Sequence, residues 1–217
     1  MRRTLISLLI ALSVSGAALA ADDVSKVNGT AEVAAGQHVG NVSTVNGSVR
    51  IGDKAVVEKA TTVNGAVELG SGASATLVKT VNGSLTLRDS ARVSEDVTNV
   101  NGRVKLEHGA DVKGRLSNVN GDVSLDSAHV GGGIETVNAD VTIGENSKVE
   151  GGLLVKKPKM NWFSSNEDRK PKIVVGPHAV VQGNLTFERD VDLYVSDSAT
   201  VGKIEGATAK KFAGSAP

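Results

Sequence analysis

A three-residue motif, Val-Asn-Gly, recurs along this 217-residue chain at a nearly constant interval. Copies begin at residues 27, 45, 63, 81, 100 and 119, and a seventh copy at residue 137 has alanine in place of glycine. The intervals are therefore 18, 18, 18, 19, 19 and 18 residues. A unit of this length cannot bury an apolar face by itself, so the units are expected to stack on one another.

Each unit holds three short apolar stretches separated by polar or glycine-containing corners. In the second unit these stretches contain Val42, then Val49 and Ile51, then Ala55 and Val57. Alternation with a period of two indicates strands with one buried face. We therefore predict an all-β fold, a single-stranded parallel β-helix (a triangular β-solenoid) with coils of about 18 residues. Roughly nine coils at ~4.8 Å would give a rod of about 40 Å.

The composition agrees with a narrow, repetitive interior. Aromatic residues make up 2% of the chain, whereas hydrophobic residues as a whole make up 40%. A compact globule fills its centre with large aromatic side chains. A core of valine, leucine, isoleucine and alanine suits thin coils better.

The asparagine of the motif has a structural role in this prediction. Stacked in register, the side-chain amides of successive copies could hydrogen-bond along the rod as a ladder. The expected ladder consists of Asn28, Asn46, Asn64, Asn82, Asn101, Asn120 and Asn138.

A chain of antiparallel hairpins is the competing fold, because Asn-Gly between apolar strands is a strong hairpin signal. In such a hairpin Val45 would pair with Ser48, and the motif valine would lie on the polar face beside Ser43 and Arg50. The most regular apolar position of the chain would then be exposed in all seven copies. We therefore favour the solenoid.

The first twenty residues are typical of a secretory signal. Arg2 and Arg3 precede a short apolar stretch over 4–14, and Ala18-Leu19-Ala20 supplies small residues at a cleavage site. We expect cleavage after Ala20, no transmembrane span afterwards, and a periplasmic, secreted or cell-surface location. The chain has no cysteine and a net charge of zero, so neither disulfides nor nucleic-acid binding is expected.

The expected solenoid domain covers residues 21–205, followed by a tail or cap over 206–217. A loop inserted at 156–171 interrupts one coil, with a proline near each end. Lys157, Trp162, Phe163 and Arg169 form a candidate binding loop, because an insertion in a regular array is a natural place for a binding site. The same aromatic residues could instead fold back on the solenoid.

We find no pattern of residues that predicts catalysis, a metal or a cofactor. The four histidines, at 38, 108, 129 and 178, are not in adjacent positions of neighbouring coils, and no cysteine supports a metal site. Gly131-Gly132-Gly133 lacks the strand-to-helix context of a phosphate loop. The chain is therefore expected not to be an enzyme, and a polysaccharide-active enzyme is the least favoured alternative.

Two runs of the type apolar-Gly-x-x-Ala-x-Val, at 51–57 and 175–181, resemble the bactofilin family of polymer-forming proteins. The recurring Asn-Gly-x-apolar-x-apolar pattern is also similar to adhesin-like β-repeat proteins of bacterial envelopes. The similarity covers residues 27 to 205. It implies a right-handed, triangular, non-enzymatic scaffold that joins end to end. Bactofilins are usually cytoplasmic, and the signal segment departs from that pattern.

These observations favour an exported structural protein, an envelope scaffold or adhesin-like rod. Its terminal coils offer unpaired strand edges for self-association, and its partner would be an envelope polysaccharide or protein. The alternative is a carbohydrate- or peptidoglycan-binding module that uses the Trp162–Phe163 loop.

Overall fold

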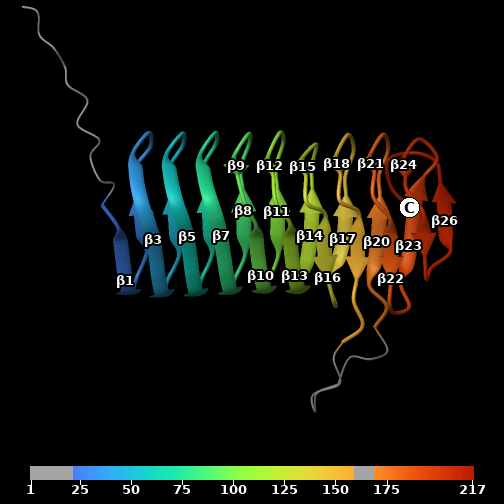
Figure 1. Ribbon diagram of the computed structural model, residues 1–217, viewed down its shortest axis with the longest axis horizontal. Helices are drawn as coiled ribbons and strands as arrows, with labels where there is room; N and C mark the ends of the chain where they lie inside the picture. The colour runs from blue at the N-terminus through green and yellow to red at the C-terminus, as the bar shows by residue number, and fades with distance from the viewer. Residues whose placement is uncertain (1–21, 159–168) are drawn as a thin grey trace, which may run out of the picture.

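The computed structural model describes residues 22–158 and 169–217 and shows a parallel β-solenoid. These residues form 26 strands and no helix, and every strand pairing is parallel. Figure 1 shows the coils following one another along the longest axis, with the N-terminal coil at one end and the C-terminal coil at the other. The fold predicted from the motif spacing is therefore confirmed.

The strands stack into three faces that run the length of the rod. The first face holds β9 (Arg92–Val93), β12 (Asp111–Val112), β15 (His129–Val130), β18 (Lys148–Val149), β21 (Val180–Val181) and β24 (Thr200–Val201). The second face holds β1 (Val24–Asn28), β10 (Val97–Asn101), β13 (Leu116–Asn120), β16 (Ile134–Thr136), β19 (Leu153–Val155), β22 (Leu185–Phe187) and β25 (Ile204–Glu205).

The third face is a ten-stranded sheet and fixes the number of coils at ten, one more than the sequence suggested. It holds β2 (Ala31–Val33), β4 (Val49–Ile51), β6 (Val67–Leu69), β8 (Leu85–Leu87), β11 (Val104–Leu106), β14 (Asp122–Leu125), β17 (Asp140–Ile143), β20 (Lys172–Val175), β23 (Asp192–Ser196) and β26 (Ala209–Phe212). The tenth strand is β26, which pairs with β23, so the solenoid continues to residue 212 rather than ending near 205.

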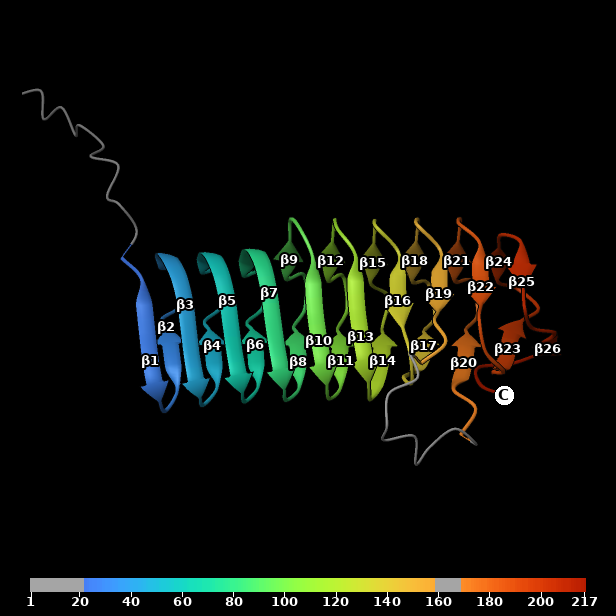
Figure 2. The same ribbon diagram turned by 60° about the horizontal axis from the view of Figure 1, so that its bottom comes forward.

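Three nine-residue strands in the N-terminal half cover the first and second faces together: β3 (His38–Asn46), β5 (Val56–Asn64) and β7 (Ser74–Asn82). In β7 the inward residues Ala75 and Val78 are three positions apart, and the strand bends without a break. In the next coil Val93 and Val97 are four positions apart. The extra residue forms a turn that separates β9 from β10, as Figure 2 shows.

A column of polar side chains lies inside the solenoid along the second face. Thr62 Oγ1 donates a hydrogen bond of 2.9 Å to the carbonyl of Gly47 in the preceding coil. In the wider coils the longer Asn99 and Asn118 replace threonine and donate to Gly83 and Gly102. These bonds satisfy carbonyl groups that would otherwise be buried without partners.

The motif glycine is needed because the backbones of successive corners lie very close. A Cβ atom added at Gly65 would lie 2.0 Å from the carbonyl oxygen of Gly47, and one at Gly83 would lie 2.1 Å from that of Gly65. No side chain fits at such a distance. The glycine therefore permits the stacking of the corners.

The structure corrects the argument used against hairpins. The motif valine lies on the outer surface, and Val27, Val45 and Val63 are 67%, 42% and 41% exposed. The inward position before the corner belongs to the preceding residue, such as Thr44, which is 4% exposed. Alternation from the buried Val42 points the side chain of residue 44 inward and that of residue 45 outward.

We predict that Gly65→Ala lowers the free energy of unfolding by about 3 kcal/mol, because the new methyl group meets backbone that cannot move. Gly72→Ala is the control, since its added Cβ comes no closer than 3.5 Å to any neighbour and only the positive φ is strained. That variant should lose about 1 kcal/mol. Urea denaturation followed by circular dichroism measures both, and equal losses would contradict the explanation.

Candidate interaction surfaces

The seven motif asparagines form a continuous hydrogen-bonded column at the corner between the second and third faces. In the six asparagines that follow Asn28, the side-chain amide nitrogen donates to the side-chain oxygen of the asparagine one coil nearer the N-terminus. The six donor–acceptor distances run from 2.8 Å to 3.3 Å. All the amides therefore point in the same direction along the rod.

Arginine side chains meet the ladder at its C-terminal end. The Arg189 guanidinium donates to Asn138 Oδ1, where an eighth asparagine would otherwise bind. Arg169 donates to the Asn138 backbone carbonyl at 3.3 Å and to Asp140 Oδ2 at 2.6 Å. Arg169 also lines a small hollow of about 380 Å³ with Asn101, Asn120 and Asn138.

The two described ends of the insertion are both fixed to the solenoid. The backbone nitrogen of Lys157 donates to Glu188 Oε2 at 3.1 Å, and Arg169 is held by Asp140. The other two residues of the candidate binding loop, Trp162 and Phe163, lie outside the described residues. The structure thus places Lys157 and Arg169 on the solenoid and leaves the aromatic part of that prediction untested.

An exposed apolar stripe follows the outer edge of the second face beside the ladder. It consists of the motif valines, and we call it the valine stripe: Val27, Val45, Val63, Val81, Val100, Val119 and Val137. The first three are exposed, and the other four are half-buried. The outward positions two residues before the first three valines are Ser25, Ser43 and Thr61, so the stripe has an uncharged neighbour there. Sequence reasoning missed this surface because it placed the motif valine in the core.

One histidine joins neighbouring coils on the first face. His129 Nδ1 lies 2.6 Å from Asp111 Oδ1, and His129 Nε2 lies 3.3 Å from Glu150 Oε1. Lys113 contacts Asp111 at 3.0 Å, and Lys148 contacts Glu150 at 2.7 Å. These acidic and basic side chains form one connected network along three coils, which ties those coils together.

The pKa values of the two carboxyl groups respond to this network. Partial burial by itself raises the pKa of Asp111, but hydrogen bonds from His129 and Lys113 outweigh burial and hold the pKa below its usual value. Hydrogen bonds from Lys148 and then from His129 lower the pKa of Glu150. Both groups thus favour their charged form in the folded protein.

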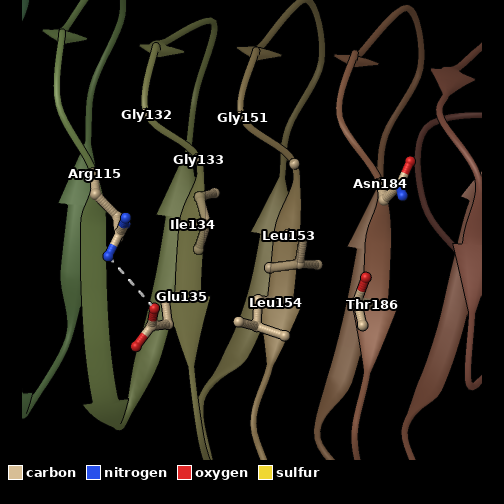
Figure 3. Close-up of a pocket in the computed structure, with 11 residues that line it drawn as sticks. Arg115, Gly132, Gly133, Ile134, Glu135, Gly151, Leu153, Leu154, Asn184 and Thr186 are labelled. Carbon is tan, nitrogen blue, oxygen red and sulfur yellow. Dashed lines mark ion pairs between the residues drawn. The ribbon is translucent and has the colours of Figure 1, made fainter.

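A groove of about 440 Å³ crosses the second face in the C-terminal half. In Figure 3, Glu135, Leu154 and Thr186 project from β16, β19 and β22, and glycine backbone forms the edge above them. Glu135 contacts Arg115 at 3.7 Å and Lys156 at 2.5 Å. Glu135 is the single carboxylate among the residues that line the groove, whereas glycoside hydrolysis uses a pair.

The four histidines are spread over different parts of the solenoid. His38 lies on β3 and His129 on β15, while His108 and His178 lie at corners, and the structure does not bring them together. Within residues 22–158 and 169–217, no group of three or more metal-binding side chains has a suitable arrangement. The same residues include no helix that is long and apolar enough to cross a membrane.

No protein-family model, curated protein or solved structure matches this chain.

We predict that the protein becomes less stable as the pH falls through the lowered pKa values of Asp111 and Glu150. A carboxyl group whose pKa is lowered by folding stabilises the native state above its ordinary pKa, and protonation removes that contribution. Thermal unfolding between about pH 6 and about pH 3 measures the loss. Asp111→Asn should flatten the pH dependence, whereas Asp126→Asn at an exposed corner should leave it unchanged. Identical slopes for the two variants would contradict the prediction.

Proposed function

We propose that this chain is an exported, non-catalytic rod that acts as a structural or adhesive element of a bacterial envelope, in the periplasm or at the cell surface. The observation that carries the proposal is the uninterrupted stack of ten coils with in-register columns on its outer faces. Such a stack holds identical side chains at a fixed spacing of ~4.8 Å. The signal-like residues 1–20 support export, although they lie outside the described residues.

The valine stripe is the part of the surface best suited to bind a partner. Val27, Val45 and Val63 are three of the four exposed large hydrophobic residues in the described part of the chain. The adjoining asparagine ladder uses one donor and one acceptor per amide for its internal bonds and retains further capacity toward solvent. An apolar stripe beside a row of amides can bind the apolar face and the polar groups of an extended envelope polysaccharide or protein.

If the valine stripe binds the envelope, Val45→Lys should reduce retention of the protein by envelope material. The charged lysine side chain would have to be desolvated on binding. Val56→Lys is the matched control, since Val56 is 38% exposed but lies on the part of β5 that belongs to the first face. Cell fractionation and co-sedimentation with isolated envelopes measure retention. We expect at least a roughly tenfold loss for Val45→Lys and little change for Val56→Lys.

Two results would reject the proposed function. One is that the chain stays in the cytoplasm with residues 1–20 still attached. The other is that the purified protein degrades an envelope polysaccharide.

The second candidate is a carbohydrate- or peptidoglycan-binding module that uses the inserted loop. It is favoured by the attachment of both described ends of the insertion to the solenoid, through Lys157 to Glu188 and Arg169 to Asp140. Trp162→Ala should then abolish pull-down by peptidoglycan while the circular dichroism spectrum stays unchanged. Tyr194→Ala, outside the insertion, is the control. Equal binding by the wild type and Trp162→Ala would reject this candidate.

A further inference from the structure

Both end faces of the rod have a lysine at a position that points inward in the neighbouring coils. At the N-terminal end, Lys26 on β1 pairs in register with Thr44, which is 4% exposed. At the C-terminal end, Lys211 on β26 pairs with Val195, which is fully buried. Because side chains of paired residues in a parallel sheet lie on the same side, both lysines stand on the inner side of a terminal strand.

The two lysines end two different columns of the interior. The column that ends at Lys211 runs through nine apolar residues from Val33 to Val195. The column that begins at Lys26 continues through threonine and asparagine residues to Val155 and Phe187. In the described part of the chain, no buried residue has an ionisable side chain. A charge at the end of each column is therefore a departure from the pattern.

Any joint between two rods would bury these charges. In a head-to-tail joint that continues the same register, Lys211 of one copy would face Val33 of the next, and Lys26 would face Gly206. Head-to-head contact buries two copies of Lys26, and tail-to-tail contact buries two copies of Lys211. Every arrangement thus removes two ammonium groups from water, and no carboxylate of the interior columns would compensate them.

At the N-terminal end the lysine is also engaged within its own coil. Lys26 Nζ donates to the Thr30 carbonyl at 2.5 Å, so its charged group stays at the end of the stack. Lysine residues on edge strands, and charges that point inward, are known ways of preventing strands from pairing with other chains.

We propose that Lys26 and Lys211 keep the rods from joining end to end, and that the end faces would otherwise pair with a second copy of this chain. The backbone edges of β1, β2, β25 and β26 have no further coil to pair with in the described structure. Their register continues the spacing of the interior coils, so removal of the two charges leaves end faces of the same kind as an interior coil. This inference is independent of the envelope role, and it departs from the expectation that the terminal coils self-associate.

The test replaces each lysine with the residue that its column has in the neighbouring coil, Lys26→Thr together with Lys211→Val. Sedimentation velocity over a concentration series and electron microscopy of the purified chain measure assembly. The wild type should sediment as single rods. The double variant should form rods of several lengths, with an association constant roughly a hundredfold higher or more.

The matched control is Lys79→Thr with Lys105→Val, which makes the same change of charge at exposed outward positions of β7 and β11. This control variant should sediment as single rods, like the wild type. Assembly of the wild type to the same extent as the double variant would overturn the proposal. So would a double variant that keeps its circular dichroism spectrum and stays single, or that forms only amorphous aggregates. If the double variant fails to fold, Lys26→Met with Lys211→Met removes the charges at nearly constant side-chain length and is judged by the same outcomes.

Discussion

The close approach of each coil's backbone to the coils on either side is the constraint on which the whole structure depends. A single coil has almost no interior of its own, so its apolar side chains find burial only by stacking. The stacking distance is fixed by backbone hydrogen bonds between parallel strands. At the motif corner this leaves no room for a Cβ atom between Gly47 and Gly65. The regular repeat of the sequence follows from this one spacing.

The same constraint determines which changes the repeat tolerates. One added residue between Val93 and Val97 opens a corner without shifting the register of the faces, since β9 and β10 both keep their pairing with β7. The interior then has room for Asn99 where earlier coils have Thr80. The insertion at 156–171 obeys the same rule, since β19 and β20 keep their partners on both sides.

In a solenoid the stacking of coils buries the interior side chains. The surfaces that stay open to a partner are the outer faces along the rod and the two end faces. The outer faces repeat with the period of the coils and provide long stripes, and the second face also carries a groove in its C-terminal half. The two end faces are different, since strand edges there remain unpaired. The proposed envelope role therefore rests on the sides of the rod, and the proposed block on self-association rests on its ends.

The 18-residue period predicted the stacking that brings Asn46 beside Asn64 in one amide column. The choice of a parallel solenoid over hairpins rested on a buried motif valine, and the structure exposes that valine while showing the parallel pairing. The sequence also predicted the position of the inserted loop at 156–171. The tertiary structure alone decided whether each side chain near a corner faces the interior of the solenoid or the solvent. Two consecutive residues can point outward there, and local alternation breaks down. The pairing of His129 with two carboxylates and the position of Lys211 over Val195 depend on the registers between coils, which only the structure shows.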